Sequence, residues 1–592
     1  MKSRRFILWT LVLFLFFIKD NASTESISLP SSPQKRTLTR RYDVIKIRGD
    51  FLSPFDNVPI QQLRLLAFKN GEITPIPFQI DERDPTGKLV MSKGKTASKD
   101  DDNGLLDSND ELVFMVMDAG DKLSDKEKTD KIEIEITDPR YSDKKAWVYL
   151  EDSKSPYSPR SPIDYVNYEP SSERIISKNY ILGYRKGFMF YNDLIYPSSV
   201  GGNGMDFLDR IKVRFKVEFF KGKMVIERSE DSVKAEVTGW IDGPVRVVQA
   251  SVNHVKLFDM LPPIGFDSLS EYYSTLMASP ITVKIPFDLN KITKALGVRT
   301  IIADIYGDMP GLVEGKAYTN LCLEGFEHTG HMPVEIYNKI PKKGIQWGFV
   351  SKKGVGTWFP RVVFPDPMYQ YNNYYLKDDV SFHNPPEDVP GEIAGGVRLI
   401  LTDYPPELIE QIGTESFMLM FETYFAKPGT SSAEAKEWLD IQDHPLIVGV
   451  KFGSNLKPKP KKNSKKSSLP PWKGGCDGTI TDNIGRKIPL KKIAFFIGSI
   501  DVDARLYFGG ERVEDKTFHK LALSQLKSME NYIVDYDPYT KTKMAMFTKI
   551  KLKSGEAMNL MSCKACGWAG VDEDSRVVYL SNSQISRIDF SD

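Results

Sequence analysis

The chain has 592 residues, with 80 basic and 79 acidic side chains and a formal net charge of +1. This balance gives no global field to attract a polyanion, which argues against a nucleic-acid-binding protein. The length exceeds what one hydrophobic core usually organises, so we expect roughly two to four domains.

The N-terminal segment predicts export. Three basic residues precede an apolar run over residues 6–18, and small residues follow at Ala22 and Ser23. As a helix this run would span roughly 20 Å, less than the ~30 Å hydrocarbon core of a bilayer. The pattern favours a signal peptide over residues 1–23 rather than a transmembrane anchor. We therefore expect a secreted, periplasmic or cell-surface protein with no transmembrane segment in its mature chain.

Residues 24–160 predict an antiparallel β-sandwich. The strands expected there are 42–47, 63–68, 73–80 and 111–117. Asn70-Gly71 predicts a type I′ turn between the second and third, because both central positions need positive φ. Four prolines and four serines over residues 151–170 mark the end of this domain.

Residues 170–455 predict a larger antiparallel β domain. Over residues 211–219 apolar residues alternate with charged ones, which is typical of a strand with one face in the core and one in water. Further strands are expected at 234–237, 245–254, 281–285, 300–305, 397–401 and 417–425. Short helices are expected at 268–276, 406–412 and 432–439.

A basic linker and a small module complete the chain. Residues 455–475 contain seven lysines, four prolines and no acidic residue, so a linker over 456–478 is expected to lack a packed core. Residues 479–592 predict a compact β-rich module with one helix over 518–529 and strands at 493–497, 504–508, 545–552, 577–580 and 588–590. The predicted fold class is mainly β and multidomain: an antiparallel β-sandwich, a larger β-supersandwich-like domain, and a small C-terminal α+β or β-barrel-like module.

The stretch 99–111 gathers six acidic residues, two asparagines and one glycine. Calcium takes six to eight oxygen ligands, about 2.4 Å away, and loops offer them by alternating Asp and Asn with a Gly at the bend. The predicted ligands of a structural Ca²⁺ are Asp101, Asn103, Asp107, Asp110 and Glu111. The alternative is a polar loop that binds no ion.

The sequences ITPIPFQIDERD and DDNGLLDSNDELVFMVMDAGD resemble the opening β-sandwich module of some secreted bacterial proteins associated with polysaccharide breakdown. The resemblance covers about residues 60–121, and Gln79, Asp81, Asp110 and Glu111 match its pattern. It implies an extracellular, sugar-related context and a galactose-mutarotase-like β-supersandwich as a candidate for the second domain. No lyase or hydrolase signature aligns with the later regions.

The stretch 357–388 is the predicted ligand-binding region, because aromatic rings and amides alternate there beside proline-rich loops. The alternative is that these rings belong to the core. The candidate residues are Trp358, Tyr369, Tyr371, Tyr374, Tyr375, Asn372, Asn373 and His383.

The four cysteines include a C-x-x-C pair, Cys563 and Cys566. Such a pair is half of a metal knuckle, but a full set would need Cys476 and one more ligand. In an exported protein a structural disulfide among Cys476, Cys563 and Cys566 is the leading interpretation, with metal binding and redox chemistry as alternatives.

Two functions remain open. The first is an exported, non-catalytic protein that binds a glycan or another component of the cell envelope. The alternative is a carbohydrate-active enzyme, a polysaccharide lyase or glycoside hydrolase, with its site in the second domain. Whether the chain is an enzyme stays undecided, because no nucleophile, carboxylate pair or full metal set stands out. No cofactor other than calcium is expected.

Overall fold

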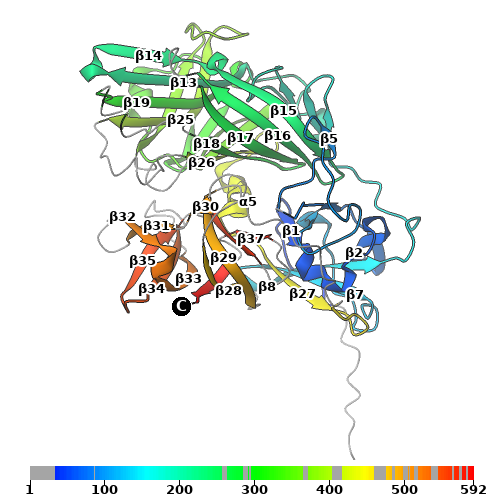
Figure 1. Ribbon diagram of the computed structural model, residues 1–592. Helices are drawn as coiled ribbons and strands as arrows, with labels where there is room; N and C mark the ends of the chain where they lie inside the picture. Colours follow the sequence, from blue (N-terminus) through cyan, green and yellow to red (C-terminus); the bar gives the residue numbers. More distant parts are fainter. Residues whose placement is uncertain are drawn as a thin grey trace, which may run out of the picture.

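The computed structural model shows a mainly β, multidomain protein built from antiparallel sheets (Figure 1). It describes residues 34–591 except 86, 257–262, 285–290, 292–294, 296, 364–370, 403–415, 459–474, 483–486, 498–503, 506, 513–517, 535–544, 563–565, 572–576 and 582–584. The predicted signal peptide, most of the basic linker and the predicted helix at 406–412 lie outside the described residues. Within the described part of the chain, no helix has the length and apolar character needed to cross a bilayer.

The first domain contains two sheets around one core that includes Leu65, Phe114 and Ile134. The smaller sheet has the order β1 (Val44–Arg48), β6 (Glu111–Met115), β4 (Gln79–Asp81), and the larger has the order β27 (Ile447–Phe452), β7 (Lys131–Asp138), β8 (Tyr141–Asp152), β2 (Leu63–Lys69), β3 (Glu72–Pro75). β27 thus returns to this domain from far along the sequence.

The predicted hairpin at Asn70-Gly71 is confirmed, since both residues have positive φ, 54° and 87°. The single strand expected over 73–80 is wrong. Its residues form β3 and β4, which belong to different sheets, and Pro75 at the end of β3 has no N–H with which to extend the ladder.

The second region is built on a ten-stranded sheet that two smaller sheets cover. Its order is β21 (Cys322–Glu327), β20 (Lys316–Thr319), β22 (Gly348–Lys352), β23 (Gly356–Val363), β26 (Ser416–Tyr424), β18 (Leu276–Lys284), β17 (Ile264–Tyr273), β16 (Arg246–Val255), β15 (Val233–Asp242), β5 (Lys93–Gly94). The last strand, β5, comes from the first domain. We call the face that carries Val247 and Phe266 the inner face; it packs in the largest core cluster.

A four-stranded and a five-stranded sheet contribute to that same core. The four-stranded sheet has the order β12 (Tyr191–Ile195), β11 (Ile181–Tyr184), β10 (Arg174–Ser177), β9 (Val166–Glu169), and the five-stranded sheet has the order β14 (Met224–Arg228), β13 (Arg210–Phe219), β19 (Thr300–Asp308), β25 (Glu392–Thr402), β24 (Asn372–Asp379). β13 corrects one expectation: of the charged side chains expected in water over 211–219, Lys212 is fully buried, whereas Arg214, Lys216 and Glu218 are half-buried.

The predicted helices are part right and part wrong. The helix expected at 432–439 is confirmed as α5 (Ser432–Asp443), which begins with a capping box between Ser431 and Glu434. The segment 268–276 instead forms the end of β17 and the turn into β18, because its side chains alternate between two packed faces. A short helix, α3 (Val334–Lys339), is an addition.

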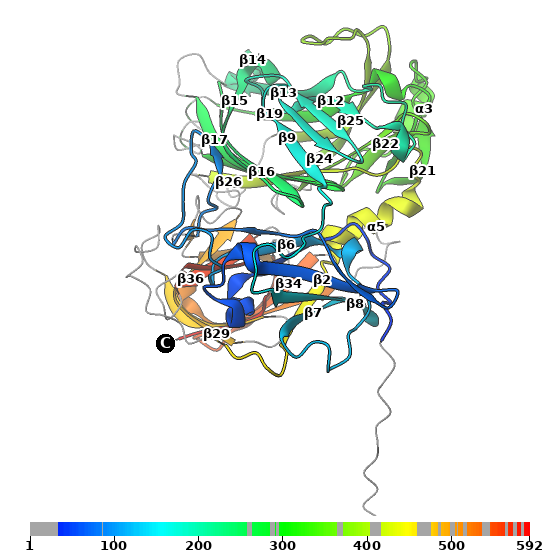
Figure 2. The ribbon, with the colours of Figure 1, turned by 90° about the vertical axis from the view of Figure 1, so that its right-hand side faces the viewer.

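The C-terminal module consists of antiparallel strands. They are β28 (Cys476–Asp482), β29 (Lys487–Ile497), β30 (Ala504–Arg505), β31 (Tyr507–Arg512), β32 (Phe518–Ala522), β33 (Leu526–Val534), β34 (Ala545–Leu552), β35 (Ala557–Ser562), β36 (Cys566–Val571), β37 (Val577–Ser581) and β38 (Ile585–Phe590). The helix predicted at 518–529 is wrong: β32, a 3-10 turn and β33 occupy it, and Leu521, Leu526 and Met529 pack in the core. Figure 1 shows this module beside the first domain, and Figure 2 shows the second region above both, with α5 between.

The first domain and the second region meet around Arg246, whose side chain is fully buried. Its guanidinium lies 2.6 Å from Asp81, 2.6 Å from Glu111 and 2.9 Å from Glu271. Gln79 accepts hydrogen bonds from the backbone N–H groups of Val245 and Arg246. An apolar cluster that includes Met115, Tyr424 and Trp438 surrounds this contact.

We predict that Arg246→Ala strongly destabilises the protein, because the buried carboxylate of Asp81 and the half-buried carboxylates of Glu111 and Glu271 then lose their shared cation. Breaking a buried ion pair costs about 3–5 kcal/mol of unfolding free energy. The matched control is Arg174→Ala, which removes a half-exposed arginine 3.9 Å from Asp193 and should cost about 1 kcal/mol or less. Urea unfolding measures both, and equal costs would contradict a structural role for Arg246.

Candidate functional site

A cavity of about 560 Å³ lies between the four-stranded sheet and the inner face of the ten-stranded sheet. Residues of β9, β11 and β12 line one side, and residues of β15 to β18 and β26 line the other. Its volume falls in the range of roughly 300–1,000 Å³ that ligand sites usually have. Of the spaces between the described residues, it is the main candidate for a binding site.

Aromatic side chains form the walls of this cavity. Tyr168 packs edge-on against Trp240, with ring centroids 5.4 Å apart. Tyr184 meets Tyr272 in the same way, and their hydroxyl oxygens are 2.9 Å apart. Such rings combine an apolar face with a polar tip, so they suit a ligand that itself has apolar and polar sides.

The floor of the cavity is polar. Gln249 faces Ser270, and Ser251 faces Ser268, in the register of β16 with β17. Hydroxyl oxygens are 2.7 Å apart both between Ser251 and Ser268 and between Ser270 and Ser279. Asn253 also donates hydrogen bonds to Ser251 and Ser268. Because a hydroxyl has one donor and two acceptor sites, the Ser270 and Ser279 hydroxyls retain the most capacity for further hydrogen bonds. We call Gln249 and the four serines the polar strip.

The mouth of the cavity carries charge. Arg185 and Lys186 are exposed in the loop between β11 and β12, and both line the cavity. Lys95 forms an ion pair with Glu236. The Tyr168 hydroxyl donates a hydrogen bond to Glu173, at 3.0 Å.

The cavity tyrosines keep their protons at neutral pH. Burial raises the pKa of Tyr272 to about 12 and raises that of Tyr184 well above its ordinary value. A tyrosine that acts as a general base needs the opposite shift, toward the working pH. Burial therefore suits these tyrosines to hydrogen bonding as neutral groups rather than to proton abstraction.

Two residues of the predicted binding region are core residues. Trp358 is 2% exposed and donates a hydrogen bond from Nε1 to the Tyr191 hydroxyl, at 3.0 Å. Tyr374 is 4% exposed and belongs to the same cluster. Asn372 is also buried, because alternate residues of β24 point to the core.

The remaining predicted residues do not converge on one point. Tyr375 stacks on Tyr306 with ring centroids 4.0 Å apart, and its hydroxyl donates a hydrogen bond to Glu392. His383 is exposed and lies 2.7 Å from Glu387. Tyr371 and Asn373 are half-buried, the Asn373 amide donating to the Tyr371 carbonyl, and Tyr369 lies outside the described residues. Ligand binding there stays a prediction.

A buried charge cluster lies under the loop that carries His383. Lys212 is fully buried, with its ammonium 2.7 Å from Asp308 and 3.5 Å from Glu387. Asp209 accepts hydrogen bonds from the backbone N–H groups of Asp388 and Val389, which fixes the loop. Burial raises the pKa of Asp308 to about 7, although Lys212 opposes this shift.

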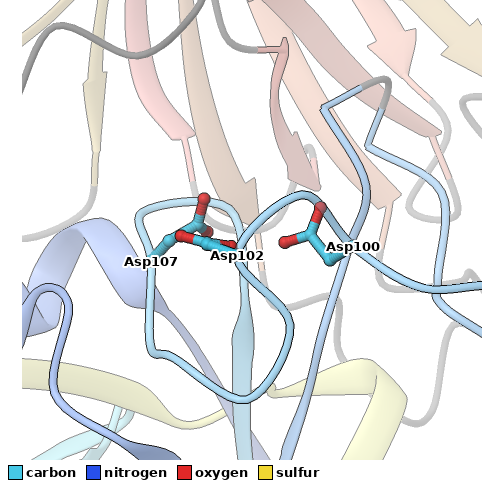
Figure 3. Close-up of side chains that lie close together, drawn as sticks. All are labelled: Asp100, Asp102 and Asp107. Atoms are coloured by element: carbon cyan, nitrogen blue, oxygen red, sulfur yellow. The ribbon is translucent and has the colours of Figure 1, made fainter.

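The acidic loop brings together Asp100, Asp102 and Asp107, whose carboxylate oxygens lie within 4.8 Å of one another (Figure 3). Asp107 was among the ligands predicted from the sequence. Crowding of three carboxylates in a partly buried loop is unfavourable without a cation. Accordingly, the pKa of Asp100 is raised to about 8, chiefly because the carboxyl group is buried and secondly because it lies beside Asp102.

The other predicted calcium ligands do not join this triad of aspartates. Asp101 and Asn103 are exposed. Asp110 is buried and accepts hydrogen bonds from the backbone N–H groups of Asp107 and Arg83. Glu111 instead binds Arg246. The three aspartates that converge lie in the loop singled out from the sequence, but only Asp107 belongs to the predicted set. Calcium binding stays a prediction.

The cysteine prediction also stays a prediction. Cys322 and Cys476 form no disulfide with any described residue. Cys563 and the side chain of Cys566 lie outside the described residues.

The cavity residues were not identified from the sequence. A signal was nevertheless present: Ser268, Ser270 and Tyr272 alternate with Leu269 and Glu271, so a β pattern places polar groups on a face that packs in the core. An apolar face would be the usual choice at such positions.

We predict that Asp308→Asn flattens the dependence of stability on pH. The pKa of Asp308 in the folded protein, about 7, is above the unfolded value of ~3.9, so the folded state binds this proton more tightly between these values. Its contribution to stability is present below about pH 4 and is lost as the pH rises to about 7. Melting temperatures of the variant and the wild type are measured at several pH values. If the two plots of melting temperature against pH are parallel, the raised pKa of Asp308 is contradicted.

For calcium, we predict that millimolar Ca²⁺ raises the melting temperature of the protein relative to chelator. The gain is about 2.7 kcal/mol at a calcium concentration one hundred times the dissociation constant. Asp107→Asn should abolish the shift, whereas Asp101→Asn, which removes an exposed carboxylate outside the triad, should preserve it. If the calcium-dependent rise in melting temperature persists in Asp107→Asn, or is absent in the wild type, the three aspartates do not bind calcium.

Comparisons with known proteins place the chain in no family. No family model matches it, and no curated protein sequence is similar to it. Similar solved structures include an alpha-mannosidase from Enterococcus faecalis V583 (TM-score 0.39, 7% identity, 95% of this chain, 56% of that chain) and a protein in glycosyl hydrolase family 38 from Enterococcus faecalis (TM-score 0.39, 8% identity, 94% and 57%). The chain spans just over half the length of these proteins. We therefore infer function from the geometry of the cavity and not from them.

Proposed function

We propose that this protein is exported and binds a carbohydrate in the cavity between the four-stranded sheet and the ten-stranded sheet. The observation that carries the proposal is the combination of aromatic walls and a polar floor within one cavity of about 560 Å³. Export is inferred from the N-terminal sequence alone.

A carbohydrate has the chemistry that this cavity complements. A sugar ring presents apolar C–H faces, which can pack on the rings of Trp240 and Tyr168, and neutral hydroxyls, which can bond to the polar strip. The serines of the strip already pair with each other. An alkyl ligand would leave their remaining hydrogen-bonding capacity unused and shut away from water, and a buried polar group without its partner costs about 1–3 kcal/mol. The lining therefore favours a sugar over a lipid.

Binding without turnover fits the cavity better than hydrolysis or elimination. Glycoside hydrolysis usually needs two carboxylates that flank the scissile bond. The two carboxylates that line the cavity are Glu173, which accepts from Tyr168, and Glu236, an exposed residue paired with Lys95. Neither lies on the floor, and the tyrosines are held neutral.

We predict that Trp240→Ala weakens saccharide binding by about thirtyfold, since truncation of a central aromatic contact costs about 2 kcal/mol. The control is Tyr157→Ala, because Tyr157 is 93% exposed and lies outside the cavity. An oligosaccharide selected on a glycan array is titrated by calorimetry into both variants and the wild type.

Assays for new reducing ends and for unsaturated products run on the same samples. Binding without product supports the proposal, whereas product release would show that the protein is a hydrolase or a lyase. Equal affinity in wild type and Trp240→Ala would contradict binding in this cavity.

A further inference from the structure

The mouth of the cavity carries more positive charge than its own carboxylates neutralise. Its carboxylates, Glu173 and Glu236, already have partners in Tyr168 and Lys95. Arg185 and Lys186 have no carboxylate partner among the described residues. The mouth therefore offers cations that the protein itself leaves available.

A third cation, Lys234 of β15, does not line the cavity itself but lies against Phe188, which does. The Arg185 guanidinium lies 4.4 Å and the Lys234 ammonium 4.1 Å from the centroid of the Phe188 ring. Lys234 likewise has no carboxylate partner in the described part of the chain. Two like charges beside one ring repel each other, and an anion that approaches both would offset this repulsion.

The loop that carries these charges is fixed to the sheet. The Phe188 N–H donates to the Arg185 carbonyl, at 3.0 Å, and the Ala235 N–H donates to the Gly187 carbonyl, at 3.1 Å. The backbone at the mouth is thus held in place without a ligand, so less ordering entropy is lost when a ligand binds.

We propose that the ligand is an acidic saccharide, whose anionic substituent is bound at the mouth by Arg185, Lys186 and Lys234. Its hydroxyls face the polar strip, and its ring packs on the aromatic walls. The anionic group is a carboxylate, as in a uronic acid, or a sulfate ester. This inference rests on the proposed carbohydrate-binding function and adds the class of saccharide.

The test compares three oligosaccharides of equal length by calorimetry: an oligogalacturonide, a sulfated galactan fragment and a neutral galactan fragment. The full protein should bind one of the acidic compounds at least about tenfold more tightly than the neutral one at low salt, and this preference should shrink as salt is added. The acidic compound that binds more tightly distinguishes carboxylate from sulfate.

Two triple variants complete the experiment. The mouth variant carries Arg185→Gln, Lys186→Gln and Lys234→Gln. The control carries Lys88→Gln, Lys126→Gln and Lys178→Gln, which removes the same charge from exposed positions outside the cavity. In the mouth variant the affinity for the acidic compound should fall by about tenfold, while the affinity for the neutral compound is unchanged. The control variant should bind both compounds as the wild type does.

The possible failures are distinguishable. If the wild type binds acidic and neutral compounds with equal affinity, or if both triple variants lose affinity for the acidic compound equally, the proposed specificity for acidic saccharides is wrong. The proposal that the cavity binds a carbohydrate would still stand. Absence of binding to all three compounds, together with no effect of Trp240→Ala, would overturn both proposals. Unchanged melting temperatures in the two triple variants establish that a loss of affinity is not a loss of fold.

Discussion

One buried guanidinium joins the first domain to the second region. The Arg246 side chain is fully buried. Its guanidinium forms ion pairs with Asp81 and Glu111 of the first domain and with Glu271 of the ten-stranded sheet. Burial of a charge is costly unless its partners are held in place. Here the backbone of the two sheets holds them, and Lys46 adds a second cation 2.6 Å from Glu271.

This contact also decides which side chains face the cavity. Arg246 and Glu271 lie on the face of the ten-stranded sheet that meets the first domain. Because side chains alternate along a strand, Gln249 of β16 and Ser270 of β17 must then point to the opposite face, where the cavity lies. A slip of one residue in either strand would exchange the two faces. The ionic contact and the polar strip are therefore two results of one strand register.

The sequence predicted local structure well and long-range pairing poorly. The turn at Asn70-Gly71 and the capped helix α5 depend on neighbouring residues, and both are confirmed. The pairings of β27 with β7 and of β5 with β15 join segments far apart in the chain, and no local pattern encodes them. The cavity could not be predicted from the sequence for the same reason, since its walls come from two sheets that meet only in the folded protein. Likewise, the composition of the acidic loop drew attention to it. Which three aspartates converge depends on the path of the backbone, and the sequence alone did not show this. By contrast, Gln79 and Asp81, named only as part of a resemblance, and Glu111, also named as a calcium ligand, contact Arg246 in the structure.

A crystal structure of the protein with a bound acidic oligosaccharide tests this account most directly. We expect electron density for the sugar between the four-stranded sheet and the inner face of the ten-stranded sheet, with a ring against Trp240, hydroxyls within hydrogen-bond distance of Gln249 and Ser270, and the anionic group beside Arg185. Density at the surface around Tyr375 and His383, or on the C-terminal module, with the cavity free of sugar, would contradict it.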